Sequence, residues 1–235
     1  MTSTPLRARQ DRGAHHLEPD HYGRSVLGHP LEVWMPSGRC RLLIFASIHG
    51  NEGETTAALS LALRHLEQSS PHCAVVLAAN PDGLLRGTRG NARGVELNRN
   101  FPTKDWRPGP VPHRETLGDP RDVALSPGDG PGSEPETQAL MKLVADLQPD
   151  SVVALHSPLE CIDDAESGPL AHWLAERTGM PLVQDVGYPT PGSFGTWGGE
   201  QGLSVVTYEF PLITPDEAVR LHVPVLVELL TRMPA

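Results

Sequence analysis

Residues 41–53 read RLLIFASIHGNEG, and this stretch decides the fold. Positions 41–47 hold a continuous apolar run, which is typical of a strand that is buried on both faces of a sheet. The polar run HGNEG follows at once, and residues 55–66 then carry leucines on one helical face. A buried strand that turns directly into a helix predicts an α/β domain.

The same alternation continues on both sides of that stretch. Apolar and turn patterns predict further strands at 31–35, 73–79, 151–155, 181–184 and 203–208, and further helices near 133–147, 170–177 and 215–230. Ser133 and Glu136 have the spacing of a capping box at the start of the first of these helices. Strands that alternate with helices predict a mainly parallel sheet covered on both faces. We expect residues 31–235 to form one domain and residues 1–30 to be a polar leader packed on or near it.

Two segments show no sustained period. Residues 84–132 are rich in proline and glycine, and residues 187–202 are rich in glycine. Long irregular segments inside a single domain are commonly functional loops, so both are places to look for a site.

The composition excludes several classes of function. The 235 residues include 19 Lys and Arg against 29 Asp and Glu, a net charge of −10, which disfavours nucleic acid and anionic membranes as partners. No apolar run approaches the ~20 residues needed to cross a bilayer. Three irregularly spaced cysteines do not support a disulfide framework, and the first 23 residues lack the apolar core of a signal peptide. We therefore expect a soluble cytoplasmic protein.

Polar side chains follow three of the predicted buried strands. His49 lies just past the strand at 41–47, His156 follows the strand at 151–155, and Glu209 follows the strand at 203–208. The carboxyl ends of strands form the ligand crevice of an open α/β sheet, so we expect these side chains to converge.

The donor types at these strand ends suit zinc. His49 and Glu52 form an H-x-x-E unit, and His156 would complete the three protein ligands of a catalytic zinc site, with one position left open for water. An isolated H-x-x-E unit also arises by chance among 11 histidines and 29 acids, so the strand-end placement carries the argument. Glu209 has two interpretations, a general base for the zinc-bound water or a salt-bridge partner.

A second group of candidates lies in the first irregular segment, within LLRGTRGNARGVELNRNFP. Arg89, Asn98 and Arg99 could clamp a carboxylate or stabilise an oxyanion, since a guanidinium offers two parallel hydrogen bonds. A solvated basic loop is the alternative. No G-x-S-x-G elbow and no phosphate-binding glycine loop occurs, which disfavours a serine hydrolase and a nucleotide enzyme.

Six blocks, in order along the chain, resemble the carboxypeptidase A-like zinc metallocarboxypeptidases: HGNE, NPDG, RGN, GVELNRNFP, LHS and a glutamate late in a strand. The longer runs HYGRSVLGHPL, GSEPETQAL and VGYPTPGSFGTW resemble the bacterial murein peptide amidases of that family. The resemblance implies a mixed, about eight-stranded sheet between helices, in place of a mainly parallel one. It also implies one Zn²⁺ per chain, held by His49, Glu52 and His156.

The other matching positions take their roles from the same resemblance. Arg89 matches the arginine that polarises the scissile carbonyl, Asn98 and Arg99 match the pair that binds the terminal carboxylate, and Glu209 matches the general base. Glu96 stands where many relatives carry aspartate, a change that we expect to leave the chemistry unaltered.

The implied reaction is hydrolysis of the γ-D-glutamyl–meso-diaminopimelate bond of the murein tripeptide L-Ala-γ-D-Glu-meso-diaminopimelate, during recycling of peptidoglycan peptides. Three rivals stay open: an aspartoacylase-like zinc deacylase of N-acyl amino acids, a catalytically silent module that binds muropeptides, and a carboxypeptidase of ordinary L-peptides. The number of subunits also stays open, with a homodimer as one arrangement.

Overall fold

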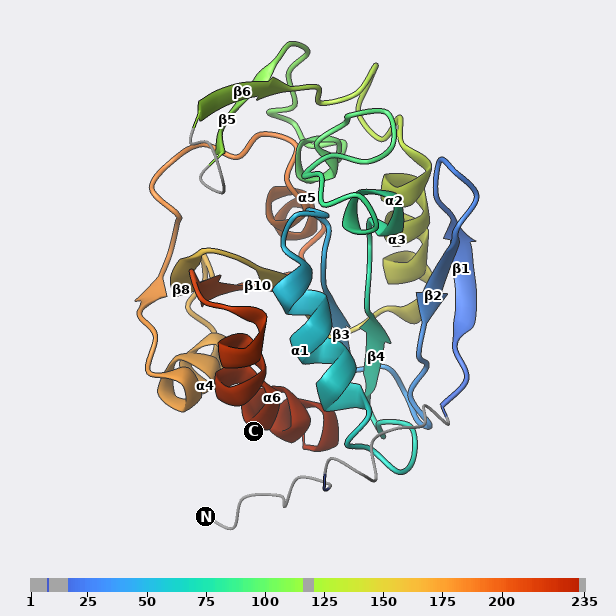
Figure 1. Cartoon of the computed structure of the whole chain (residues 1–235), viewed down its shortest axis with the longest axis vertical. Coiled ribbons are helices and arrows are strands. Elements are labelled where there is room, and N and C mark those ends of the chain that lie inside the picture. Colours follow the sequence, from blue (N-terminus) through green and yellow to red (C-terminus); the bar gives the residue numbers. More distant parts are fainter. Residues whose placement is uncertain (1–7, 9–16, 116–120, 233–235) are drawn as a thin grey trace.

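A six-stranded sheet forms the centre of the structure, a computed structural model that describes residue 8, residues 17–115 and residues 121–232 (Figure 1). From edge to edge its strands are β4 (Cys73–Val76), β3 (Leu42–Phe45), β7 (Ser151–His156), β10 (Ser204–Pro211), β8 (Leu159–Asp163) and β9 (Leu182–Val183). Strands β4, β3, β7 and β10 are parallel, and β8 runs antiparallel to β10. The predicted α/β class with a mixed sheet is confirmed.

Two short ribbons flank this sheet. Strand β1 (Asp20–Arg24) pairs with β2 (Pro30–Val33), and β5 (Val111–Glu115) pairs with β6 (Arg121–Leu125). Residues 1–7 and 9–16 of the expected leader lie outside the described residues, and its boundary at residue 30 stays a prediction.

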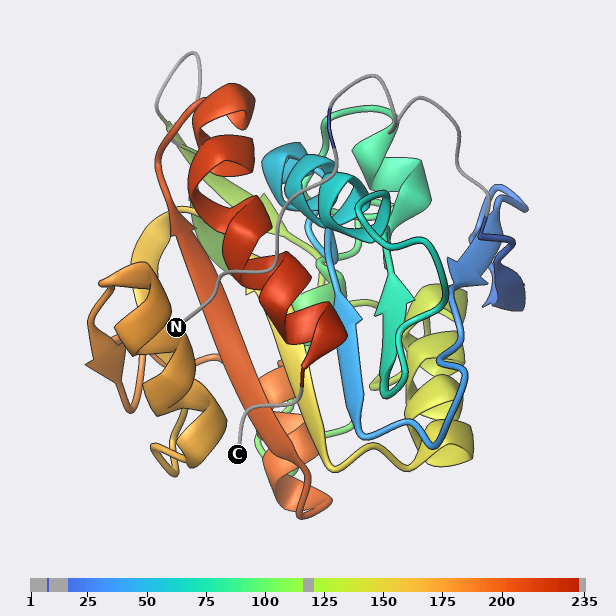
Figure 2. The ribbon, with the colours of Figure 1, turned by 90° about the horizontal axis from the view of Figure 1, so that it is seen from below.

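Helices cover both faces of the sheet (Figure 2). One face packs against α1 (Gly53–Leu63), α4 (Pro169–Thr178) and α6 (Pro215–Thr231). The other packs against α3 (Pro135–Leu147) and α5 (Phe194–Glu200). Two one-turn helices, α2 (Pro81–Leu84) and the 3-10 helix η2 (Leu97–Arg99), lie in the connection between β4 and β5. Among the described residues, no helix is both long and apolar enough to cross a membrane.

The central strands alternate strictly between these two layers. In β3, Leu42 and Ile44 face α1 and α6, while Leu43 and Phe45 face the opposite layer. Both sets are fully buried, which is why the run at 41–47 reads as continuously apolar. In β10 the residue Tyr208 faces α6, so Glu209 points to the other side, where the functional pocket lies.

Several elements differ from the sequence prediction. Strand β8, helix α5 and the β5–β6 ribbon were not predicted, and β10 continues through Glu209 to Pro211. Helix α5 is FGTWGGE, whose three glycines disfavour a helix, and it forms because Phe194 and Trp197 are buried against the sheet. The predicted capping box is also wrong: Glu134 is the N-cap residue of α3, and no side chain caps that helix.

Candidate active site

The metal-ligand candidates converge at the carboxyl ends of two neighbouring parallel strands. His49 lies in the turn after β3, and His156 is the last residue of β7. Glu52 occupies the N-cap position of α1, so the turn and the helix start present His49 and Glu52 together.

The turn can fold this tightly only because residue 50 is a glycine. A Cβ atom at Gly50 would collide with the backbone of Gly83 and of Leu84. The amide of Gly50 also donates to the carbonyl oxygen of Arg89. The motifs HGNE and NPDG are therefore packed backbone against backbone, which fixes where His49 and Glu52 point.

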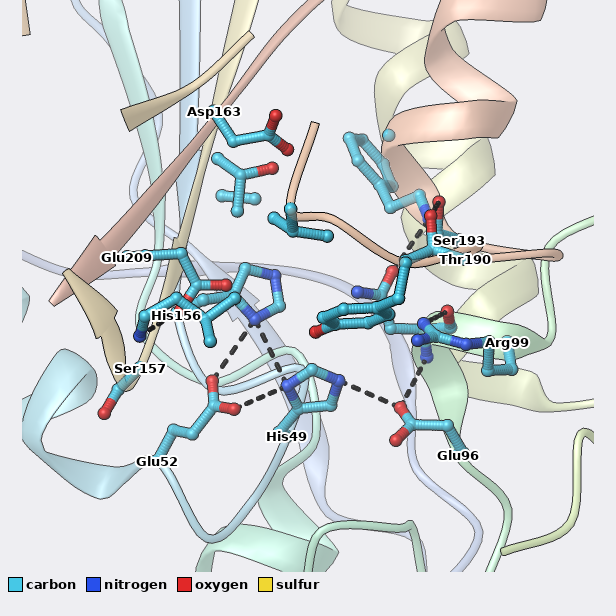
Figure 3. A pocket seen from close by; sticks show the side chains of 18 of the residues that line it. His49, Glu52, Glu96, Arg99, His156, Ser157, Asp163, Thr190, Ser193 and Glu209 are labelled. Atoms are coloured by element: carbon cyan, nitrogen blue, oxygen red, sulfur yellow. Dashed lines mark hydrogen bonds and ion pairs between the residues drawn. The ribbon is translucent and has the colours of Figure 1, made fainter. Parts of the chain in front are cut away.

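Three electron-pair donors meet in a buried space (Figure 3). The Nδ1 atom of His49 lies 2.7 Å from Oε1 of Glu52, and Nδ1 of His156 lies 3.2 Å from Nδ1 of His49 and 3.2 Å from Oε2 of Glu52. All three residues are at most 5% exposed. Burial opposes ionisation, yet His49 and His156 hold the pKa of Glu52 well below its usual range.

This donor set fits a divalent cation. Two imidazoles and a carboxylate are the ligands of many catalytic zinc sites. Two Nδ1 atoms that face each other at 3.2 Å cannot both satisfy their lone pairs on one another, whereas a shared cation satisfies both.

The buried carboxylate of Glu96 contacts the ring nitrogen of His49 that faces away from the other metal-ligand candidates. Glu96 is 1% exposed, and its Oε1 atom lies 2.9 Å from Nε2 of His49. Its other oxygen accepts a hydrogen bond from Nε of Arg89, whose Nη1 donates to Glu52 at 3.2 Å. Burial opposes the charge, but Arg89 and His49 hold the pKa of Glu96 well below its usual range. Sequence reasoning gave Glu96 no role, although its place two residues before the Asn98-Arg99 pair was a usable signal.

Glu209 lies beside His156, because β10 and β7 pair these two residues in register. It is 7% exposed, and burial raises the pKa of its carboxyl group. The amide of Leu159 donates to its Oε2 atom at 3.3 Å, and no protein donor in the described part of the chain meets its other oxygen. A buried carboxylate with a raised pKa and a free oxygen suits a general base near neutral pH.

The last candidates form a cationic end of the pocket. Arg99 is 8% exposed, and burial lowers its pKa, yet its Nη1 atom donates only to the carbonyl oxygen of Asn98. No carboxylate of the described chain forms an ion pair with Arg99. The Oδ1 atom of Asn98 accepts from the amide of Phe194 at 2.8 Å, which leaves the NH₂ group to donate. A ligand carboxylate would satisfy both groups.

All seven residues predicted from the sequence line one pocket, a cavity of about 710 Å³. Tyr188 also lines it, from a Gly/Pro-rich loop where a single tyrosine gave no sequence signal. The three cysteines are free and buried.

Comparisons with known proteins agree with this geometry. Residues 6–162 match the zinc carboxypeptidase family, peptidase M14. Murein peptide amidase A of Escherichia coli strain K12 is 48% identical over 219 residues, which cover 92% of this chain and 90% of that protein. Murein peptide amidase A of Vibrio campbellii is 41% identical over 230 residues, 96% of this chain and 92% of that protein.

Comparison with solved structures gives matches in the same family of proteins. The crystal structure of murein-tripeptide amidase MpaA from Escherichia coli O157 has a TM-score of 0.93 and 45% identity and covers 100% of both chains. Carboxypeptidase A from Helicoverpa armigera shares the fold, with a TM-score of 0.67, 17% identity and coverage of 89% of this chain and 65% of that one. The chain therefore belongs to the peptidase M14 family of zinc carboxypeptidases.

Proposed function

We propose that this chain hydrolyses the amide bond between γ-D-glutamate and meso-diaminopimelate in the murein tripeptide L-Ala-γ-D-Glu-meso-diaminopimelate. The relatives that cover nine-tenths of the chain carry the name murein peptide amidase, which supports this substrate. One observation carries the proposal: the His49, Glu52 and His156 donor set shares its pocket with a buried acid and with a buried arginine that forms no ion pair within the described residues.

In this proposal His49, Glu52 and His156 hold the zinc ion. A zinc ion in such a site polarises the scissile carbonyl and lowers the pKa of water to about 7. Glu96 orients His49 through its Nε2 atom and so keeps Nδ1 directed at the site.

The remaining residues bind the peptide and move the proton. Arg99 and the NH₂ group of Asn98 bind the terminal carboxylate, which fixes the register of the peptide. Arg89 donates to the oxygen of the γ-glutamyl carbonyl as charge develops there. Glu209 takes a proton from the attacking water and delivers it to the nitrogen of the leaving diaminopimelate.

The substitution Glu209→Gln tests the reaction. It removes the base and keeps the size and the burial of the side chain, so we expect diaminopimelate release to fall by about 10²–10⁴-fold. Zinc content and tripeptide binding should stay at wild-type levels, measured by metal analysis and calorimetry. Glu54→Gln is the matched control, because Glu54 also lines the pocket and has no assigned role. An active Glu209→Gln enzyme would show that the base is assigned wrongly.

The rivals predict different products. A deacylase would release acetate from N-acetylaspartate faster than diaminopimelate from the tripeptide, and a silent module would bind the tripeptide and release nothing. A panel of peptides with ordinary L-residues at the C-terminus distinguishes a general carboxypeptidase. We also propose a cytoplasmic location, which the three free, buried cysteines support.

A further inference from the structure

The sheet places a second row of side chains beside the predicted catalytic residues. Strands β7, β10 and β8 pair Ala154 with Thr207 and Thr207 with Asp163, in register. On β7 and β10 these residues lie two positions before His156 and Glu209, so both rows face the same pocket. The Cα atoms of Asp163 and His156 lie about 12 Å apart, because two strand spacings and the rise of two residues separate them.

Part of the pocket near these two rows is apolar, although Ser193, Thr196 and Thr207 also line it. Ala154, Val205 and Phe194 line the pocket, together with Gly195 and Gly199, which have no side chains. Figure 3 shows the carboxylate of Asp163 at the opposite end of the view from His49 and Glu52. A side chain of several methylene groups that entered from the catalytic end could lie against this apolar surface with its tip near the carboxylate of Asp163.

Asp163 differs from the acids beside it in its partners. The Asp164 carboxylate accepts from the amides of Glu166 and Gly168, and the Asp185 carboxylate accepts from the amide of Gly187. The carboxylate of Asp163 has neither a hydrogen bond nor an ion pair within the described ranges of the chain. Burial, then the charges of Asp164 and Asp185, raise the pKa of Asp163. An unpaired carboxylate that is partly removed from water lacks a cation.

The two ends of the pocket therefore have opposite charge. Figure 3 shows Arg99 on one side of the view and Asp163 on the other, while Arg89 forms ion pairs with Glu52 and Glu96. A zwitterionic residue fits this arrangement when its backbone carboxylate lies at the arginines and its side chain carries a cationic group at the far end.

We propose that Asp163 binds the ammonium group at the far end of the released residue's side chain and so makes the enzyme selective for C-terminal residues with a cationic tip. For diaminopimelate this is the ammonium group of the distal carbon, at the end of three methylenes; the carboxylate on the same carbon then points away from Asp163. The inference rests on the proposed function, since that function supplies the residue that enters the pocket. It assigns Asp163 to substrate selection, while the bond-breaking step stays with the residues around His156.

Equilibrium binding tests this assignment without turnover. In the Glu209→Gln background, calorimetry compares L-Ala-γ-D-Glu-meso-diaminopimelate with the analogue that ends in 2-aminopimelate, which lacks only the distal amino group. One charge-assisted hydrogen bond predicts about 10- to 100-fold tighter binding of the diaminopimelate peptide. Adding Asp163→Asn should reduce this ratio to about threefold or less, while adding Glu54→Gln should leave it unchanged. A ratio near one in the parent, or a ratio that survives Asp163→Asn, would overturn the proposal.

A second comparison needs no substitution at residue 163. Tripeptides that end in lysine and in norleucine have side chains of similar length, and only lysine carries the ammonium group. We expect the lysine peptide to bind more tightly, and equal binding would contradict the assignment. If the wild-type enzyme binds these peptides with the expected selectivity and cleaves none of them, the proposed reaction fails and the assignment of Asp163 stands.

Discussion

His49 meets a carboxylate at each ring nitrogen: Glu52 at Nδ1, 2.7 Å away, and Glu96 at Nε2, 2.9 Å away. A carboxylate at Nε2 holds a proton there and leaves the Nδ1 lone pair for a cation. Arg89 also donates to Glu96 and to Glu52. Its guanidinium group therefore links a metal-ligand candidate to the carboxylate that supports His49. The order at this site therefore depends partly on Glu96, which has no contact with the substrate in the proposed reaction.

Glu96→Gln tests that dependence. The amide loses the negative charge that anchors Nε2–H of His49, so we expect zinc affinity to fall by about 10- to 100-fold. Competition with a calibrated chelator measures the affinity. Glu96→Asp keeps the carboxylate and should recover most of it. Zinc binding by the Gln variant at wild-type strength would contradict the supporting role.

At this scale the sequence was most informative where the chemistry is local. His49, Glu52, Arg89, Asn98 and Arg99 sit in short motifs, and all of them reach the pocket. The support that Glu96 gives to His49 and the position of Asp163 depend on contacts made across the fold. For Glu96 the sequence offered one local signal, its place beside the Asn98-Arg99 pair, and for Asp163 it offered none. Their roles stay predictions until the variants are measured.

Strand β10 organises the site at the scale of elements. It is paired on both sides, in parallel with β7 and antiparallel with β8, so Glu209 lies inside a paired strand. The sequence prediction ended this strand at residue 208, three residues too early, because Glu209 interrupts the apolar pattern that marked it. Strand β8, LECID, alternates weakly and carries two acids, so its pairing with β10 could not be predicted from its own residues.

The glycine between His49 and Asn51 gives a prediction about the turn. Gly50→Ala would place a Cβ atom against backbone that cannot move independently, so we expect the free energy of unfolding to fall by roughly 2–4 kcal/mol. Urea denaturation measures the loss. Gly130→Ala is the control, because the space around that residue is open, and its effect should stay within about 1 kcal/mol.

Helix α6 gives a prediction about pH. His222 is 4% exposed, its Nδ1 atom lies 2.7 Å from the hydroxyl oxygen of Tyr208, and burial lowers its pKa to about 4. The unfolded chain therefore takes up a proton near pH 6.5 that the folded chain resists until about pH 4. Stability from this residue is complete above pH 6.5 and declines as the pH falls to about 4, by on the order of 2–3 kcal/mol.

The substitution His222→Gln isolates this contribution. The variant should be less stable than wild type at pH 7, because Tyr208 loses its partner, and its stability should fall less steeply between pH 6.5 and 4. Denaturant midpoints across that range measure both slopes. Parallel slopes would show that His222 does not resist protonation in the folded protein.

The whole molecule is acidic, yet its pocket holds two buried arginines, of which Arg99 forms no ion pair within the described residues. The chain carries a net charge of −10, yet Arg89 and Arg99 lie together in the pocket, both largely buried. Net charge describes only the chain as a whole, so it could not reveal an arginine without an acidic partner inside the pocket. The alternation of strands and helices predicted the layered sheet, because that pattern spans the entire chain.

For the whole molecule, we predict that removing the metal lowers the stability of the fold. In the proposed site, zinc binds only the folded arrangement of His49, Glu52 and His156, so free zinc at about 1,000 times Kd should stabilise the fold by about 4 kcal/mol. For a chain of this size that corresponds to a rise in Tm of roughly 10 °C. Thermal denaturation with zinc and with a chelator measures the shift. His156→Ala should abolish the zinc-dependent shift, and an unchanged wild-type Tm would contradict the site.

The two rows of pocket-facing side chains on β7, β10 and β8 lie one pleat apart. In the proposed function, the residues that hydrolyse the bond and the residue that selects the side chain therefore lie at different positions on the same three strands. Substitutions at positions 154, 163 and 207 would change which C-terminal residue the enzyme prefers to release. They would leave the proposed catalytic residues unchanged. A few point mutations would then be enough to give a related enzyme a new substrate preference, without any rearrangement of the backbone.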